Sequence, residues 1–269
     1  YVRGRERSRE PKDIIREIER DVADGVKEVM LLGQNVNSYG KNLEHPISFA
    51  KLLQEIEKIE GLERIRFMTS HPKDLSDELI AVMGQSKKIC RHLHLPLQSG
   101  SSRILKLMNR KYTKESYLDL VDRIRKGCPD ISLTTDIIVG FPGETDEDFE
   151  ESYDFAKNIG FSKIHVFPYS PKRGTPAAAR KDQVSPQKKE ERSAKLIALS
   201  NKMADDFIQK FVGRKMPVLF EQSHESGKFE GHTSNYINVT VETDKNIKNM
   251  ILDTVIEGCK DEKAFGKLL

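Results

Sequence analysis

The chain has 269 residues, of which 37% are hydrophobic and 32% are charged, and its formal net charge is +3 at pH 7. This composition excludes a disordered chain, and the length suits one large domain or a medium domain with a small partner. The sequence contains no apolar run long enough for a membrane helix and no charged-then-apolar leader, so it predicts a cytoplasmic protein without a membrane partner.

Helical and strand patterns alternate through the first two-thirds of the chain. Pro11 opens a helical stripe that runs to Val22, and Glu28 to Leu32 has the pattern of a buried strand. Further strands are expected at residues 64–69, 93–97, 131–139 and 164–167, with helices at residues 49–59, 75–83, 104–108, 117–124 and 145–158. Strands and helices in this order predict parallel strands with right-handed crossovers. Five such strands suit a partial (β/α) barrel of the TIM type that lacks its first unit, and a doubly wound open sheet is the alternative.

The last third of the chain has a different pattern. A long helix is expected from Ser185 to Phe211, ended by Gly213. Beyond it the apolar residues alternate with a period of two, at residues 217–221, 227–232, 237–242 and 250–257. This pattern predicts a small all-β barrel. The sequence therefore predicts two domains, residues 1–210 and residues 211–269.

Small residues, amides and hydroxyls follow each of the five expected parallel strands. These strand ends are residues 33–37, 69–72, 98–101, 140–145 and 168–171. Ligands of parallel barrels and sheets bind at the carboxyl ends of the strands. The sequence therefore predicts one shared site for a polar ligand at this face.

Two histidines alternate on the third expected strand. His92 and His94 lie on one face of that strand and are able to bind a metal together, as in metal-dependent barrel hydrolases. No acidic residue follows them on the strand, and Gln98 is a poor metal ligand. We therefore interpret both histidines as inward-facing polar residues near a cofactor, and keep a barrel hydrolase as an alternative function.

The three cysteines do not form a recognisable ligand motif. Cys90, Cys128 and Cys259 are far apart in the sequence, and none stands in a paired spacing. A zinc or iron–sulfur site needs three or four soft ligands at one point. We therefore expect three unpaired thiols and no metal site on this chain.

Basic residues are concentrated in a few segments. Residues 3–9 are dense in arginine, which suits phosphate recognition, although a solvated loop is an equal alternative. Further basic residues are Arg103, Lys106, Arg110, Lys111, Lys172, Arg173, Arg180, Lys181, Lys188 and Lys189. RNA affinity depends largely on such charge, whereas the small β unit is not itself basic. A non-catalytic RNA-binding module is thus a third candidate function.

Six segments resemble successive parts of the radical-S-adenosylmethionine (radical-SAM) methylthiotransferases. They are RGRERSR, LLGQNVNSYG, MTSHPKDLSDELI, RHLHLPLQSGS, TTDIIVGFPGETDEDF and FPYSPKRGTPAA, between Tyr1 and about Leu199. The tail from VGRKMPVLFE through EGHTSNYINVTV is similar to the TRAM domain of the same family, a small β-barrel that binds RNA. The resemblance implies a transferase that adds a 2-methylthio group to N6-isopentenyladenosine next to the anticodon of tRNA. The alternative is the sister enzyme acting on N6-threonylcarbamoyladenosine.

The resemblance also implies cofactors and partners. The family uses S-adenosylmethionine (SAM) and two [4Fe-4S] clusters, one of them held by a Cys-x-x-x-Cys-x-x-Cys loop. In relatives that loop ends a few residues before the segment matching Tyr1 to Gly4, so this chain alone is expected to lack the ligands of both clusters and to be inactive. The expected partners are tRNA, a sulfur donor and an electron donor, and the expected state is a monomer.

The matching motifs assign a SAM-binding role to residues at the strand ends. The expected residues are Gly33, Gln34, Asn35, Gln98, Ser99, Val139, Gly140, Phe141, Phe167 and Tyr169. The first three match the segment that holds the methionine end of SAM, the next two match the strand end that meets the ribose, and the others suit the adenine. The expected substrate or RNA contacts are Arg3, Arg5, His232, Asn235 and Tyr236. No catalytic side chain is expected, because the chemistry belongs to the cofactors.

Overall fold

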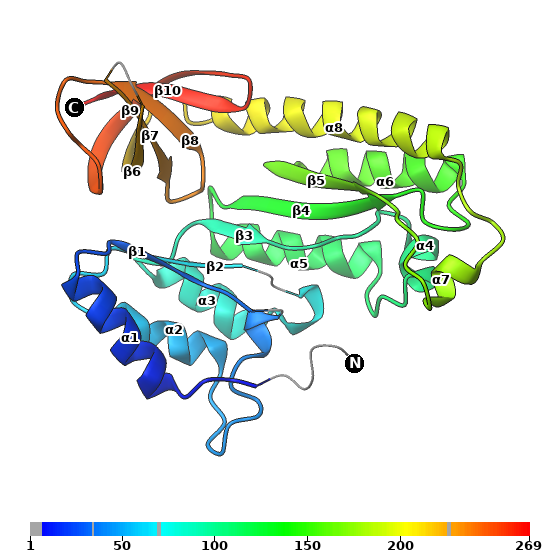
Figure 1. Ribbon diagram of the computed structural model, residues 1–269, viewed down its shortest axis with the longest axis horizontal. Helices are drawn as coiled ribbons and strands as arrows, with labels where there is room; N and C mark the ends of the chain where they lie inside the picture. Colours follow the sequence, from blue (N-terminus) through cyan, green and yellow to red (C-terminus); the bar gives the residue numbers. More distant parts are fainter. Residues whose placement is uncertain (1–6, 34, 69–70, 225–226) are drawn as a thin grey trace.

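The computed structural model describes residues 7–33, 35–68, 71–224 and 227–269. The larger of its two units is built on five parallel strands. They are β1 (Glu28–Leu31), β2 (Arg64–Phe67), β3 (His92–His94), β4 (Ser132–Val139) and β5 (Lys163–Pro168). β1 pairs with β2, and β3, β4 and β5 form a second sheet, while a parallel bridge between Ile65 and Ile89 joins the two (Figure 1). Because the strand order follows the chain without reversal, this is a partial barrel and not a doubly wound sheet, which confirms the prediction.

Helices follow or precede each strand. They are α1 (Pro11–Ala23), α2 (Phe49–Glu57), α3 (Asp77–Gln85), α4 (Ser102–Leu107), α5 (Lys114–Gly127), α6 (Asp146–Ile159), α7 (Pro176–Ala179) and α8 (Pro186–Gln209), with 3-10 turns η1 (Val36–Ser38) and η2 (Pro72–Asp74). Thr113 and Thr145 cap α5 and α6 with reciprocal side-chain hydrogen bonds. The sequence did not predict α7 and the two 3-10 turns, because such short elements have no measurable periodicity. In the part of the chain that the structure describes, no helix is both long and apolar enough to cross a membrane.

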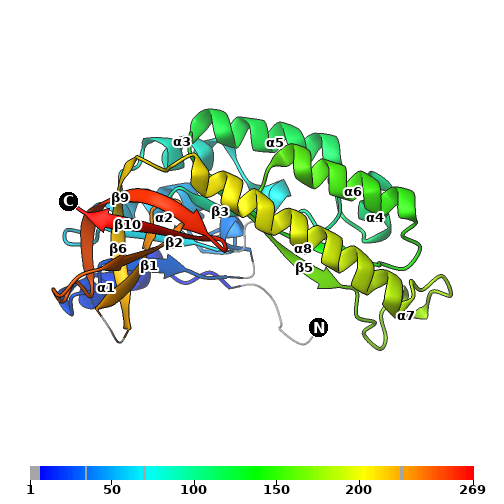
Figure 2. The same ribbon diagram turned by 90° about the horizontal axis from the view of Figure 1, so that it is seen from above.

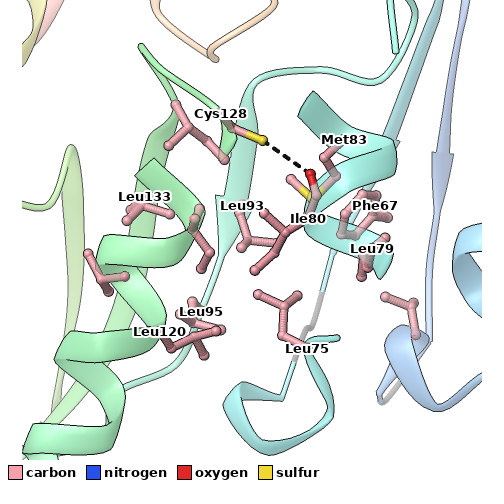
Figure 3. Packing of buried hydrophobic residues seen from close by; sticks show 14 of the residues in the cluster. Phe67, Leu75, Leu79, Ile80, Met83, Leu93, Leu95, Leu120, Cys128 and Leu133 are labelled. Atoms are coloured by element: carbon pink, nitrogen blue, oxygen red, sulfur yellow. Dashed lines mark hydrogen bonds between the residues drawn. The ribbon is translucent and has the colours of Figure 1, made fainter. Parts of the chain in front are cut away.

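The main hydrophobic core lies between the sheet and the helices that cover its outer face. Leu93 and Leu95 point from the third strand segment toward α3 and α5, as Figure 3 shows. Between these two helices, the Cys128 thiol lies 3.7 Å from the Ile80 carbonyl oxygen. A Cβ on Gly84 would come within 2.4 Å of the Gly127 carbonyl oxygen, so this close approach of α3 and α5 requires a glycine.

The last 55 residues form a closed five-stranded barrel, as expected. Its strands are β6 (Lys215–His224), β7 (Lys228–Thr233), β8 (Asn238–Glu242), β9 (Met250–Lys260) and β10 (Lys263–Leu268), in the order β10-β8-β7-β6-β9. The sequence did not predict β10, because its inward positions carry the small residues Ala264 and Gly266 instead of bulky apolar ones. Ile208 in the last turn of α8 and Phe211, just after the helix, belong to the barrel core. The division between residues 210 and 211 therefore stays a prediction, since α8 packs in both cores.

The closed barrel lies against the amino ends of the parallel strands. Pairs that span this junction include Gly25 with Asn249, Arg64 with Pro217 and His232, Asp130 with Arg214, and Lys163 with Glu262. In these pairs, each partner in the core stands just before a strand or at its first residue. Figures 1 and 2 both show the barrel at one end of the molecule and α4 and α7 at the opposite end. The carboxyl ends of the strands, where the site is expected, therefore face away from the barrel.

Candidate functional site

The loop after β1 holds an amide oxygen that lacks a hydrogen-bond partner. Asn35 Nδ2 donates to Asp74 Oδ2 and to Ser38 Oγ, each at 2.7 Å. Asn35 Oδ1 is buried, and it accepts no hydrogen bond from the residues that the structure describes. Because an unsatisfied buried acceptor is costly, this oxygen is suited to a donor group of a ligand, such as an ammonium. Gly33 stands two residues earlier, and Gln34, also predicted for this site, lies outside the described residues.

Asp74 fixes the orientation of that amide. Burial raises the pKa of Asp74, but hydrogen bonds from Asn35 and Lys41 outweigh the effect and hold the pKa below its usual value. The ionised carboxylate accepts only, so it binds the NH2 group of Asn35 and leaves the carbonyl oxygen free. Asn37 exchanges two hydrogen bonds of 3.1 Å with the backbone of His71, which joins this loop to the loop after β2.

A pocket of about 660 Å³ opens beside this loop. Its lining includes Gly33, Asn35 and Tyr39, together with side chains of β1 and α1. A volume of this order suits a nucleoside-sized ligand. The lining does not include Gln98 or Tyr169, so the pocket covers the first part of the expected site and not the part beside β3 to β5.

The backbone is strained at the carboxyl end of β3. Gln98 has a φ of +70°, which is uncommon for a residue other than glycine. Its amide donates to Asp136 O at 2.8 Å and its carbonyl accepts from Ile138 N at 2.9 Å, so two bonds to β4 hold it in place. Strain of this kind is frequent at ligand sites. Ser99 is fully buried with its hydroxyl 3.1 Å from that of Ser152, so its side chain contacts α6 and not the open face.

A buried ion pair supports the loop after β4. Glu144 Oε2 accepts from Gly140 N at 2.6 Å and from Arg192 Nη1 at 2.6 Å. Burial raises the pKa of Glu144 above its usual value, and this effect outweighs the opposing effects of the Gly140 amide and Arg192. Gly140 has a φ of +70°, and a Cβ there would meet the side chain of Lys189 at 2.4 Å, so the tight loop needs glycine. The sequence predicted Gly140 for the site and included Glu144 in the same strand end, but it missed Arg192.

Two aromatic rings meet beside this loop. Phe141 and Tyr169 lie edge to face with ring centroids 5.2 Å apart. The Tyr169 hydroxyl is buried and has no hydrogen-bond partner in the described structure. The backbone carbonyl oxygen of Tyr169 accepts a hydrogen bond from Lys189 Nζ at 3.0 Å. Phe167 is 51% exposed on β5, whereas Val139 is only 1% exposed. Phe141 is itself only 8% exposed, so Phe167 is the open aromatic residue beside the Phe141–Tyr169 pair, and Val139 is packed in the core.

The two histidines of β3 share one hydroxyl. His92 Nε2 and His94 Nδ1 lie 3.1 Å and 3.0 Å from Thr134 Oγ1. Burial, with a smaller contribution from the positive charge of Arg66, lowers the pKa of His92 to about 3. Among the described residues, no group of three or more His, Cys, Asp or Glu side chains is placed to hold a metal ion, and all three cysteines are free.

The barrel residues expected to contact RNA lie at the junction with the core. The Tyr236 ring stacks on His92 and on His232, with centroids 4.7 Å and 4.8 Å apart, and Arg66 lies 4.6 Å from its centroid. Asn235 is 2% exposed, and its amide bonds to other groups of the chain. In this arrangement Asn235 is not open to RNA, whereas Tyr236 is 41% exposed. Arg3 and Arg5 lie outside the described residues.

Two buried arginines of β2 form the polar centre of this junction. Arg64 and Arg66 are 5% and 2% exposed and donate to backbone carbonyl groups of residues 217 and 232–234. Glu28 of β1 pairs with both, at 3.7 Å and 2.7 Å. The sequence analysis missed all three residues. The available signal was the alternation of arginine with apolar residues in a strand that is expected to be buried, because parallel sheets are covered on both faces.

A scan of family models finds one match, to the Radical SAM superfamily over residues 1–156. The chain belongs to the radical SAM superfamily. Two solved structures agree with the fold of this radical SAM chain. It superposes on coproporphyrinogen III oxidase (HemN) from Escherichia coli with a TM-score of 0.50 and 18% identity, over 72% of this chain and 46% of that one. It superposes on the radical S-adenosylmethionine methyltransferase TsrM from Kitasatospora setae with a TM-score of 0.51 and 19% identity, over 63% and 33%.

Several curated relatives of this radical SAM chain have the same name. The proteins from Lachnoclostridium phytofermentans and Acetivibrio thermocellus are 50% and 48% identical over the whole chain, and both are named tRNA-2-methylthio-N(6)-dimethylallyladenosine synthase. A protein from Thermoanaerobacter sp. with the same name is 53% identical over 87% of the chain. The chain spans 59%, 56% and 50% of the length of these relatives.

The residues present at the strand ends fit SAM. The free acceptor Asn35 Oδ1 suits the ammonium of its methionine part, and the Phe141–Tyr169 pair suits a flat base. The unpartnered Tyr169 hydroxyl offers one more hydrogen bond to a polar ligand atom. Ser99 and Val139 are buried, so their side chains are not open to a ligand at this face.

Proposed function

We propose that the chain forms the SAM-binding core and the RNA-binding barrel of a tRNA methylthiotransferase that modifies N6-dimethylallyladenosine, the isopentenylated adenosine beside the anticodon. The observation that carries this proposal is the 50% identity across the whole chain to a relative named for that reaction. Similarity of this extent includes both the partial barrel and the small closed barrel. The partners that we propose are tRNA, a sulfur donor and an electron donor, with the protein acting as a cytoplasmic monomer.

SAM and two [4Fe-4S] clusters are the cofactors of this proposal, and the described residues of this chain include no ligand set for either cluster. When bound and reduced, these groups would supply a radical that removes hydrogen from the adenine ring carbon and would supply the methyl group, while the sulfur donor would provide the sulfur. This chain's own residues bind and orient. In this proposal, Asn35 Oδ1 accepts a hydrogen bond from the ammonium group of SAM, and Asp74 keeps that oxygen directed to the ligand.

The aromatic wall has a second task in the proposed enzyme. Phe141 and Tyr169 cover one side of the site, and their apolar surface excludes water from the reacting atoms. Glu144 and Arg192 hold the loop that carries Phe141, and Lys189 holds the Tyr169 backbone. These three are positioning residues, since they act through the rings and the backbone.

The competing functions have less support. A hydrolase that uses His92 and His94 needs a metal, yet both rings are engaged with Thr134. A module that binds RNA through the barrel alone leaves the strained Gln98 and the free Asn35 Oδ1 without a role. The sister reaction on N6-threonylcarbamoyladenosine remains the nearest alternative, and the product analysis below separates it from our proposal.

The test is a product analysis of tRNA. A bacterial host that lacks its own enzyme of this kind receives the gene for a longer protein that joins this chain to the upstream part of a relative. Nucleosides from its tRNA are separated by liquid chromatography and identified by mass spectrometry. We expect the 2-methylthio derivative of N6-dimethylallyladenosine. The 2-methylthio derivative of N6-threonylcarbamoyladenosine, or no methylthio nucleoside, contradicts the proposal.

Asn35→Leu provides the matched residue test. This change removes the free acceptor, so we expect SAM affinity to fall at least about tenfold, which corresponds to one lost charged hydrogen bond of about 1.5–3 kcal/mol. Asn158→Leu, at an exposed position of α6, is the control and should leave SAM affinity unchanged. Equilibrium dialysis with labelled SAM measures both variants of the longer protein.

A further inference from the structure

The barrel and the candidate SAM site lie at opposite ends of the core. The barrel contacts the amino ends of the strands through Arg64 and its neighbours, whereas Asn35, Gln98 and Tyr169 stand at the carboxyl ends. The helix α8 runs between the two ends, and its 24 residues span about 36 Å. Figure 2 shows α8 extending from the barrel to α7.

This separation limits what the barrel alone can do for an RNA substrate. A nucleotide that reacts at the SAM site must enter at the carboxyl ends of the strands, tens of ångströms from the barrel. A contact at a single distant point leaves the reacting end of the RNA free to move. Positioning of the reacting base within ångströms therefore needs a second point of contact near the site.

Basic residues surround the carboxyl ends of the strands. In residues 98–112 and 167–189 the cationic residues are Arg103, Lys106, Arg110, Lys111, Lys172, Arg173, Arg180, Lys181, Lys188 and Lys189. The acidic residue in these two segments is Asp182. These two segments are therefore strongly basic, whereas the start of α6, which lies between them in the chain, is acidic. We name these ten basic residues the cationic rim.

Contacts join the segments of the rim into one surface. Arg103 Nη2 donates to Gly143 O at 2.6 Å, and Gly143 N donates to Asp182 O at 2.8 Å, so α4 and the segment after α7 meet at the loop that follows β4. On the other side of α4, the Tyr112 ring lies 6.0 Å from the ring of His71 in the loop after β2. Both views of the molecule place α4 and α7 at the end opposite the barrel (Figures 1 and 2).

The rim residues differ in how their charge is used. Arg103, Arg180 and Lys188 pair with carboxylates, and Lys189 binds the Tyr169 carbonyl oxygen. In contrast, Lys106, Lys111, Lys172, Arg173 and Lys181 are exposed and have no ion pair within the part of the chain that the structure describes. Long cations without a carboxylate partner are free to meet an external anion.

We propose that the cationic rim binds the phosphate backbone of the RNA substrate and directs the target nucleotide into the site at the strand ends. This inference rests on the proposed function, because it assumes an RNA substrate. The evenly spaced phosphates of RNA match a surface of several separate lysines better than a single anion does. The barrel then provides a distant second contact, and the substrate lies along the molecule between the two ends.

The test compares two variants with the same change of charge. In the rim variant, Lys106, Lys111, Lys172 and Lys181 are replaced by Ala. In the matched control, Lys87, Lys126, Lys157 and Lys202 are replaced by Ala; all four are exposed, and the first three stand near the amino ends of β3, β4 and β5. Binding of this 269-residue chain to an unmodified anticodon stem-loop RNA is measured between about 50 and 200 mM salt.

Counterion release gives the expected size of the effect. Each lost phosphate contact lowers the slope of log K against log salt by about 0.7–0.9, so the rim variant should lose about 3 units of slope and about 100-fold or more in affinity. The control should stay within about threefold of the wild type. Thermal unfolding of both variants should match the wild type, because exposed lysines contribute little to stability.

Several outcomes overturn the proposal, and they differ from failure of the proposed function. Equal slopes for the rim variant and the wild type show that the rim does not contact RNA, even if the methylthio product forms. Absence of RNA binding by the wild-type chain has the same consequence. A further outcome also contradicts the proposal. If the upstream segment of the longer protein protects the rim lysines from chemical acetylation, and the rim variant binds RNA as the wild type does, the rim contacts protein and not RNA. If the rim variant shows a reduced slope of log K against log salt but no methylthio nucleoside forms, the RNA contact of the rim is supported and the proposed methylthiotransferase function is refuted.

Discussion

Asp148 shows how one side chain organises the start of α6. It accepts hydrogen bonds from Ser101 Oγ at 2.9 Å, from Arg103 Nε at 3.0 Å, and from the amide and the hydroxyl of Thr145, each at 2.9 Å. Burial raises its pKa, but the bonds from Arg103, Thr145 and Ser101 outweigh burial and hold the pKa well below its usual value. The acidic start of α6 was evident from the sequence, whereas the contact with α4 was not, because Ser101 and Arg103 lie more than forty residues away.

Stability should depend on pH through this carboxylate. Its pKa is depressed in the folded state, so its contribution is present above the unfolded value of 3.8 and is lost as the pH falls toward the folded value. We expect Asp148→Asn to lower the free energy of unfolding by about 2 kcal/mol at pH 7, and the difference from the wild type to shrink steadily below about pH 4. Urea titrations at several pH values measure this difference. Asp119→Asn, at an exposed i,i+4 pair with Arg123, should change stability by less than about 0.5 kcal/mol at any pH.

At the scale of elements, α8 connects the site with the barrel. Its first turns hold the loop after β4 through Arg192 and the Tyr169 carbonyl through Lys189, and its last turns pack Ile208 in the barrel core. The apolar stripe and the Ser185 cap made this helix predictable from the sequence. Arg192 stands four residues before Leu196 on the same stripe, so a charge on an apolar face was the signal for its buried role.

The buried pair of Arg192 and Glu144 should be worth much more than an exposed pair. Arg192→Met leaves a buried carboxylate without its partner, so we expect a loss of about 3–5 kcal/mol in the free energy of unfolding. Arg123→Met is the matched control in another helix, since Arg123 is 43% exposed and pairs with Asp77 and Asp119 at the surface. That variant should lose less than about 1 kcal/mol. Equal losses in urea titrations would show that the Glu144 contact does not hold the loop.

At the scale of the whole molecule, two hydrophobic cores are joined by a polar junction. The core of the partial barrel and that of the closed barrel are separate clusters. Between them, Arg64 and Arg66 satisfy four backbone carbonyl groups of the closed barrel, and Tyr236 packs on His92. Burying an arginine without its hydrogen-bond partners is costly in free energy, so the separation of the two units is unfavourable. The two units should therefore unfold together.

Calorimetry tests this coupling. We expect one thermal transition for the wild-type chain and two for the double variant Arg64→Met, Arg66→Met, because the substitutions remove the four hydrogen bonds that these arginines make across the junction. Arg214→Met removes an exposed ion pair with Asp130 at the edge of the same junction and should leave one transition. Two transitions in the wild type would mean that the junction does not couple the units.

The sequence by itself determined the longer elements, their order and the strand ends at which we propose the site, because helix and strand periods and turn residues act over a few neighbouring positions. It also indicated the small barrel, apart from β10, whose inward residues are small. Only the tertiary structure decided that the barrel meets the amino ends of the strands, that Asn235 is buried there, and that Arg66 lies beside Tyr236. Such contacts join residues more than eighty positions apart, and they depend on how whole elements pack, which local patterns do not specify.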